Sequence, residues 1–207
     1  MSYNPQFHHR RSIRIKGYDY TQPGGYFVTL VTQERACLFG EVVNSEIHLS
    51  PLGQVVGDEW MRLTKRFPNV ELDEFVVMPN HLHGIVVLID PAGRGTGDIG
   101  ESRATMNHPC APTRTIERFG APVPGSIPTI IRSYKSSVTQ RAQWMGRGTG
   151  VNKGSEIPEN FPRAPTVWQR NFYEHVIRNE MEWERIRLYI RENPGLWAKD
   201  RENPSHR

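Results

Sequence analysis

The chain has 207 residues, 37% of them hydrophobic, with a formal net charge of +4 and a pI of about 9.2. This length and composition exclude a disordered chain and are sufficient for one domain with a sizeable core. The positive charge favours a polyanionic partner without proving one. The two cysteines, Cys37 and Cys110, lie in no metal or redox motif, and no segment resembles a signal peptide or a membrane span. We therefore expect a cytoplasmic protein with no membrane association.

A basic arm is predicted over residues 1–20. It contains "HHRRSIRIKGYDY", in which basic side chains outnumber acidic ones, a pattern typical of segments that lie on phosphates. The candidate DNA contacts in this arm are Arg10, Arg11, Arg14 and Lys16.

One α+β domain is predicted over residues 21–198. Strand-like composition is found at 25–33, 36–43, 45–50, 69–78, 81–89 and 166–178, and helical patterning at 51–67, 126–145 and 179–193. Asn179 is a suitable N-cap for the last helix, and Pro194 is expected to end it. Two Gly/Pro-rich stretches, at about 91–126 and 146–165, are interpreted as irregular insertions, and 199–207 as a tail. This order favours helices packed on an antiparallel sheet.

Two histidines stand within the apolar run "FVVMPNHLHGIVVLI" (75–89). Because successive side chains of a strand point to opposite faces, His81 and His83 project from the same side. Two imidazoles on a rigid strand can hold a metal ion. They can equally be polar residues on a half-exposed face, and this run alone does not decide between the two.

The last helix supplies candidate partners for these histidines. Trp183, Ile186 and Ile190 form an apolar stripe that can anchor the helix to the sheet, and Tyr189 and Asn193, four residues apart, share a neighbouring face. If the helix docks against the histidine strand, Asn193 can supply a third, oxygen ligand. Two imidazoles and an amide oxygen suit Mg²⁺ or Mn²⁺, and no set of four ligands for a structural Zn²⁺ is evident.

Tyr189 is the candidate nucleophile. A phenol, with a pKa of about 10, attacks at neutral pH only when its proton is removed or its target is polarised. A metal ion on a scissile phosphate does the latter, and the product would be a covalent phosphotyrosine. Tyr134 and Tyr173 are rival nucleophiles, but neither has an amide one helical turn further on. On the helix at 126–145, Arg132 and Lys135 are either phosphate contacts or part of a solvated face.

These residues resemble the single-tyrosine HUH transposases, specifically the REP-associated tyrosine transposase branch. The histidine–hydrophobe–histidine motif is "HLH" within "VVMPNHLHGIV", and the second signature is "VWQRNFYEHVIRNEMEWERIRLYIRENP". "GYDY" with "YFVT" and "IIRSYKS" extend the resemblance over most of residues 10–197. The motif "HLH" alone is weak, whereas its combination with the second signature is specific.

The resemblance implies a ferredoxin-like or RRM-like antiparallel sheet with helices packed on one face and the two histidines on a central strand. It also implies that Tyr189 attacks single-stranded DNA to leave a 5′-phosphotyrosine and a free 3′-OH. Metal ligands would be His81, His83 and Asn193, with Mg²⁺ or Mn²⁺ as cofactor. Gln169 and Arg170, within the second signature, join the candidate DNA contacts. Substrates would be short hairpins, the repetitive extragenic palindromes, bound by a monomer or a homodimer.

Two other functions remain open at this point. The first is a module that grips hairpin DNA or RNA without cutting it, through stacking and phosphate contacts. Its weakness is that a pure binder needs neither the histidine pair nor Tyr189. The second is a metal-dependent phosphoesterase in which water attacks directly, so that no DNA stays attached to the protein.

Overall fold

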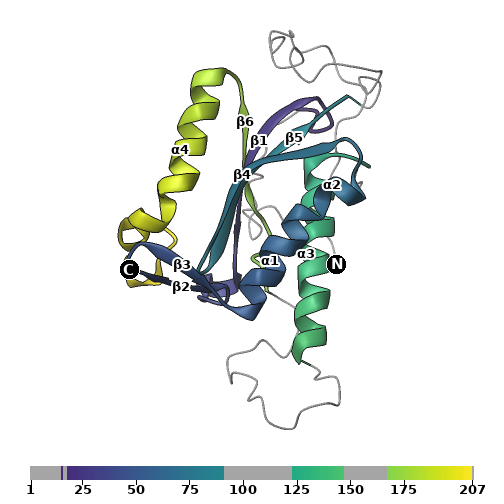
Figure 1. Ribbon diagram of the computed structural model, residues 1–207. Coiled ribbons are helices and arrows are strands. Elements are labelled where there is room, and N and C mark those ends of the chain that lie inside the picture. The colour runs from purple at the N-terminus through teal and green to yellow at the C-terminus, as the bar shows by residue number, and fades with distance from the viewer. Residues whose placement is uncertain (1–14, 16–17, 91–122, 147–166, 207) are drawn as a thin grey trace, which may run out of the picture.

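The computed structural model describes residue 15 and residues 18–90, 123–146 and 167–206 (Figure 1). The basic residues proposed in the N-terminal arm, and most of the two expected insertions, lie outside this part of the chain. No helix among the described residues has the length and apolarity needed to cross a membrane.

A four-stranded antiparallel sheet forms the centre of the fold. It consists of β1 (Gly24–Val31), β4 (Val70–Met78), β5 (His81–Leu88) and β6 (Tyr173–Ile177), in the order β4-β5-β1-β6. A separate hairpin contains β2 (Gly40–Val43) and β3 (Glu46–Leu49). The α+β class and the antiparallel sheet are therefore confirmed. Strand β5, which carries both histidines, lies between β4 and β1, in the expected central position.

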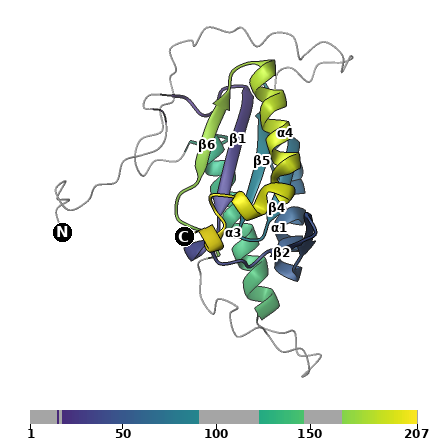
Figure 2. The same ribbon diagram turned by 90° about the vertical axis from the view of Figure 1, so that its left-hand side faces the viewer.

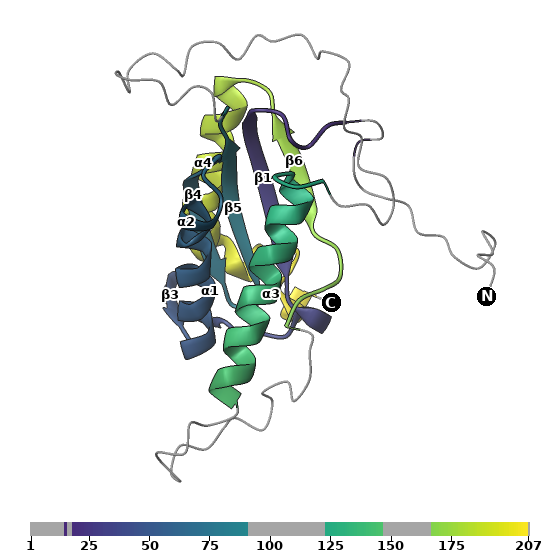
Figure 3. The same cartoon turned by 90° about the vertical axis from the view of Figure 1, so that its right-hand side faces the viewer.

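Helices cover both faces of this sheet. The longer ones are α1 (Pro51–Met61), α3 (Ile127–Gly146) and α4 (Glu180–Leu196), and α2 (Leu63–Arg66) is one short turn. Helix α1 connects β1 to β4 and α3 connects β5 to β6, which is the ferredoxin-like arrangement, and both pack on one face (Figures 1 and 3). Helix α4 packs on the opposite face. The expectation that all helices pack on one face is therefore wrong, because β5 has apolar residues on both sides.

The alternation of side chains along β5 separates the two layers. Leu82 and Val86 belong to the core under α1 and α3, which also contains Trp60 and Tyr134. Ile85 belongs to a second core under α4. The two histidines point to this second side, because they share the parity of Ile85.

Helix α4 is docked by its apolar stripe and by one polar anchor. Trp183, Ile186 and Ile190 are buried against the sheet, as the sequence predicted. Asp73 on β4 accepts hydrogen bonds from Trp183 Nε1 (2.5 Å) and from Arg187 Nη2 (2.6 Å). These contacts determine which residues of α4 face β5.

The ends of α4 agree only partly with expectation. Asn179 caps the helix, since its side chain accepts a hydrogen bond from the Glu182 N–H at 2.9 Å. Pro194 lies inside the last turn and the helix ends at Leu196, which corrects the expected end. Pro194 lacks an N–H donor, but its carbonyl still accepts a hydrogen bond from the Trp197 N–H, so the last turn persists.

Residues 199–206 are not a free tail. Short 3-10 turns at Trp197–Lys199 and Pro204–His206 fold the chain back against the end of the sheet. The carbonyl of Glu202 accepts a hydrogen bond from Asn80 Nδ2 (2.7 Å), and its carboxylate pairs with Arg35 (2.6 Å). The predicted boundary at residue 198 therefore divides a segment that belongs to the domain.

Candidate active site

The two histidines lie side by side on β5, with ring centroids 4.5 Å apart. His81 and His83 are both almost completely buried. The two rings lie at the start of β5, where α4 and the turns that follow it cover the sheet. The strand alternation therefore brings the imidazoles together as predicted.

Hydrogen bonds orient each ring through its Nδ1 atom. The Nδ1 of His81 lies 2.8 Å from Asn80 Oδ1, and Asn80 donates through its Nδ2 to the carbonyls of Arg35 and Glu202. Because the amide nitrogen is used in these bonds, its oxygen faces His81, and His81 Nδ1 must carry the proton. The lone pair of His81 is then on Nε2. The Nδ1 of His83 lies 2.9 Å from Thr29 Oγ1, which leaves its Nε2 directed into the site.

Both rings are neutral at neutral pH, as metal ligands must be. Burial lowers the pKa of His81 to about 3, although the nearby amide of Asn193 acts in the opposite direction. Burial, and then the electrostatic effect of the adjacent His81 imidazole, hold the pKa of His83 well below its usual value. The desolvation that disfavours protonation keeps one nitrogen lone pair on each ring, and on His81 that lone pair is on Nε2.

Asp200 joins the two histidines and was missed by the sequence analysis. Ligand atoms of His81, His83 and Asp200 all lie within 4.8 Å of one another. Asp200 Oδ2 is 3.8 Å from His81 Nε2, and its side chain is only 6% exposed. No periodicity or motif marks this aspartate, because the turn after α4 brings it to the site.

Asn193 lies beside the same cluster. Its side chain is buried, and it is close enough to His81 and Tyr189 to shift the pKa of both. Asn193 Oδ1 and His81 Nε2 are buried and, within the described residues, have no hydrogen-bond partner. A buried polar atom without a partner is costly, and a cation bound between these atoms would satisfy both. The residues present therefore fit a divalent cation with nitrogen and oxygen ligands.

Tyr189 stands at the open side of the cluster. Its hydroxyl oxygen lies 3.2 Å from His83 Nε2, and the side chain is 42% exposed. Burial, and then the negative charge of Asp200, raise the pKa of this phenol, while Asn193 acts against them. Tyr189 is thus protonated at neutral pH and accessible to a substrate next to the candidate ligands.

The two rival tyrosines have different surroundings. Tyr134 is fully buried on the opposite face and donates its hydroxyl proton to the Val56 carbonyl at 3.0 Å. It has no access to a phosphate. Tyr173 is exposed on β6, where Thr29 on β1 separates it from His83.

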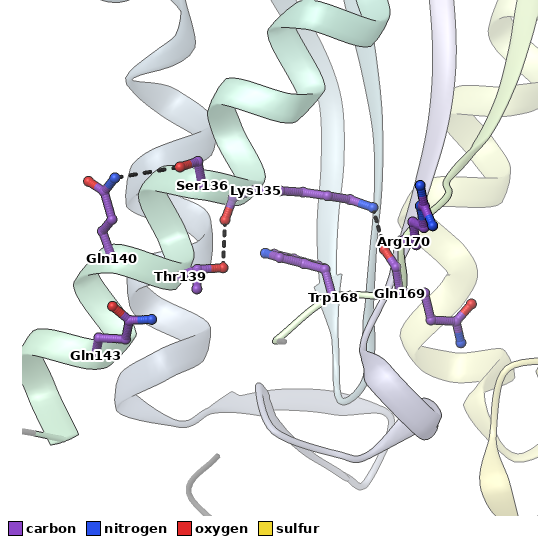
Figure 4. Close-up of a pocket in the computed structure, with 8 residues that line it drawn as sticks. All are labelled: Lys135, Ser136, Thr139, Gln140, Gln143, Trp168, Gln169 and Arg170. Carbon is purple, nitrogen blue, oxygen red and sulfur yellow. Dashed lines mark hydrogen bonds between the residues drawn. The ribbon is translucent and has the colours of Figure 1, made fainter. Parts of the chain in front are cut away.

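The other candidate DNA contacts lie away from Tyr189. Arg132 and Lys135 belong to α3, on the opposite face of the sheet (Figure 3). Lys135, Gln169 and Arg170 line a surface pocket of about 390 Å³ between α3 and residues 168–170 (Figure 4). The Lys135 ammonium donates to the carbonyls of Gln169 and Asn171, both at 2.8 Å, and burial lowers its pKa to about 8. The structure therefore gives Lys135 a role in holding this segment.

Comparison with known proteins places the chain in a family. No protein-family model matches it. An uncharacterized protein of Haemophilus influenzae is 39% identical over 198 residues, which cover 96% of this chain and 95% of that protein. The chain belongs to the same family as this protein.

Two solved structures are similar at lower identity. One is a REP-associated tyrosine transposase bound to a REP hairpin, with 20% identity, a TM-score of 0.46, and coverage of 90% of this chain and 72% of that one. The other is a candidate transposase from Deinococcus radiodurans, with 14% identity, a TM-score of 0.41, and coverage of 87% and 96%.

Proposed function

We propose that this protein is a single-tyrosine HUH transposase of the REP-associated branch, which nicks and rejoins single-stranded hairpin DNA through Tyr189. The observation that carries the proposal is the 3.2 Å distance between the Tyr189 hydroxyl and His83 Nε2, inside a cluster of candidate metal ligands. The sequence motifs "HLH" and "YIRENP" also support it, since they contain His81, His83, Tyr189 and Asn193.

Mg²⁺ or Mn²⁺ would be held by His81, His83, Asn193 and Asp200. When bound, the cation supplies positive charge that polarises the scissile phosphate. Two neutral imidazoles, an amide oxygen and a carboxylate leave room for phosphate oxygens and water at an octahedral ion. Asp200 is an addition to the ligand set predicted from the sequence, and its carboxylate strengthens the preference for a hard cation.

In the proposed reaction the Tyr189 oxygen attacks phosphorus. A bond between the phenolic oxygen and phosphorus forms, and the bond from phosphorus to the 3′ oxygen breaks. Overall, the phenolic proton passes to the leaving oxygen, which gives a 5′-phosphotyrosine and a free 3′-OH. Attack by the same 3′-OH, or by another one, reverses the step and rejoins a strand without any other energy source.

The substrate and surroundings follow from the same proposal. Short hairpins such as repetitive extragenic palindromes would be the partner, in a bacterial cytoplasm, and the protein would act as a monomer or a homodimer. The basic arm with Arg10, Arg11, Arg14 and Lys16, together with Arg132, Lys135, Gln169 and Arg170, remains the predicted set of DNA contacts.

A covalent-trapping experiment tests the proposal. The protein is incubated with labelled single-stranded hairpin oligonucleotides from beside its gene, with Mn²⁺ or Mg²⁺, and the products are separated on a denaturing gel. We expect a metal-dependent protein–DNA band that is absent in Tyr189→Phe and in His81→Ala. Tyr134→Phe removes a buried rival phenol and should retain the band. Cleavage without the band would instead indicate hydrolysis by water. Binding without cleavage would indicate a non-catalytic module that binds hairpin DNA.

A further inference from the structure

Three aromatic side chains form a continuous surface beside the candidate ligands. Phe27 on β1 stacks on the His83 ring, with centroids 5.4 Å apart and an interplanar angle of 26°. The rings of Tyr173 and Tyr189 contact Phe27 edge-on, at centroid distances of 6.3 and 6.1 Å. We call Phe27, Tyr173 and Tyr189 the aromatic ledge.

The ledge lies along the edge of α4, between the helix and β6. Figure 2 shows β1 and β6 beside α4. Tyr189 is on α4, and Phe27 on β1 belongs to the core under this helix. Phe27 is buried at 8% exposure, whereas Tyr173 is 51% exposed. Tyr173 and Tyr189, which is 42% exposed, are thus the rings of the ledge that meet solvent, and the buried Phe27 ring packs between them.

The strand register places Tyr173 at a defined distance from the reacting group. Thr29 pairs with His83 on β5 and with Tyr173 on β6, so the three residues form one row across the sheet. Adjacent strands are about 4.8 Å apart, which puts Tyr173 about 10 Å from His83. A phosphate next to Tyr189 and His83 would therefore have the Tyr173 ring within reach of the base on the neighbouring nucleotide.

We propose that Tyr173 is a positioning residue that stacks on an unpaired nucleobase flanking the phosphate attacked by Tyr189. This inference rests on the proposed function and extends it to the way the strand is held. A tyrosine face stacks on any base, so it gives affinity without sequence preference. Stacking next to the reacting phosphate also limits the strand to orientations in which Tyr189 can attack.

The test is a double-mutant cycle, in which substitutions of Tyr173 are combined with removal of single bases from the DNA, together with the trapping assay. Wild-type protein, Tyr173→Phe and Tyr173→Ala are titrated with a fluorescent hairpin oligonucleotide. They are then titrated with two derivatives that carry an abasic residue directly 5′ or 3′ of the mapped cleavage position. Trp144→Ala is the control, because Trp144 is an aromatic residue on α3, on the other face of the sheet, and is even more solvent-exposed (74%) than Tyr173. Thermal melting verifies that each variant is folded.

We expect Tyr173→Ala to bind the intact oligonucleotide about 5- to 150-fold more weakly, the range for loss of one base–aromatic stack. On one of the two abasic oligonucleotides the same substitution should have little further effect, and Tyr173→Phe should bind like the wild type. Adduct formation by Tyr173→Ala should slow by at least the loss in binding. Trp144→Ala should show no coupling to either position.

If Tyr173→Ala weakens binding of the intact and of both abasic oligonucleotides by the same factor, or does not weaken binding at all, the inference would be overturned. The nicking function would stay intact. If the wild-type protein cleaves the strand without forming an adduct, and Tyr173 is still coupled to one flanking base, the proposed function would be overturned and the stacking role would stay intact. Absence of DNA binding by the wild type would overturn both.

Discussion

The phenolic oxygen of Tyr189 lies 3.2 Å from Nε2 of His83, although 106 residues separate the two in the sequence. This distance depends on how α4 docks against β5, because Tyr189 and His83 belong to these two separate elements. The docking rests on the Asp73 anchor, on the space above Gly25 and on the apolar stripe of α4. Each of these contacts leads to a prediction, as do the groups that orient the histidines.

Thr29→Val should weaken metal binding although Thr29 is not a ligand. The substitution keeps the shape of the side chain but removes the Oγ1 that lies 2.9 Å from His83 Nδ1. Loss of such an outer partner typically reduces metal affinity by about 10- to 100-fold. Calorimetric titration with Mn²⁺ measures this. Thr139→Val removes a hydroxyl that bonds the Lys135 carbonyl on α3 and should leave the affinity unchanged. Equal affinity in both variants would contradict the prediction.

Asp200→Asn should also reduce Mn²⁺ affinity. The carboxylate is buried 3.8 Å from His81 Nε2, and its replacement by an amide removes the negative charge of the ligand set while keeping its shape. The variant should bind Mn²⁺ at least about tenfold more weakly. Asp58→Asn changes an exposed carboxylate on α1 and serves as the charge control. If both variants bind Mn²⁺ like the wild type, Asp200 is not a ligand.

Asp73→Ala should destabilise the docking of α4. It removes the acceptor of the Trp183 indole N–H and of Arg187 Nε and Nη2, while Arg187 Nη1 keeps its contact with Glu184. The loss costs roughly 2–4 kcal/mol in the free energy of unfolding. The neighbouring carboxylate of Glu74 pairs with Arg191 in an exposed ion pair, so Glu74→Ala should cost less than about 1 kcal/mol. Urea unfolding measures both values. Similar costs for the two variants would show that the anchor does not hold the helix.

Gly25→Ala should push α4 away from the sheet. A Cβ at this position would overlap the Trp183 ring, so the helix and Tyr189 with it must move. We expect a lower melting temperature and slower adduct formation. Gly195→Ala, at the end of the same helix, has open space around the new Cβ and should be neutral or slightly stabilising. Unchanged melting of Gly25→Ala would mean that the contact is not tight.

Stability should fall with pH below about 6.5 when a chelator keeps metal ions away. His81 has a pKa of about 3 when folded, and about 6.5 is expected when unfolded. Between these values the unfolded state binds more protons, so the free energy of unfolding decreases as the pH falls. The decrease is up to about 1.4 kcal/mol per pH unit for each such histidine. Urea unfolding at several pH values between 7.5 and 5 measures the slope, and His81→Gln should reduce it. An unchanged slope in that variant would refute the linkage.

Much of the candidate site was predictable from local patterns. The period of a strand places His81 and His83 on one side, and the period of a helix places Tyr189 and Asn193 on one face. The apolar stripe of Trp183, Ile186 and Ile190 follows from the same helical period, and the structure confirms its burial. These features depend on residues a few positions apart, so they could be predicted before the fold was known.

Features that depend on distant segments appear only in the folded domain. Helix α4 packs on the face opposite α1 and α3, because β5 is apolar on both sides. Asp200, in a segment expected to be a tail, lies next to the histidines. Strand pairing also sets Thr29 between His83 and Tyr173. Such contacts join segments 50 to 150 residues apart. They arise from the packing of the whole domain and leave no periodic trace in any one segment, which is why Asp200 and Thr29 are recognised as parts of the site only in the folded structure.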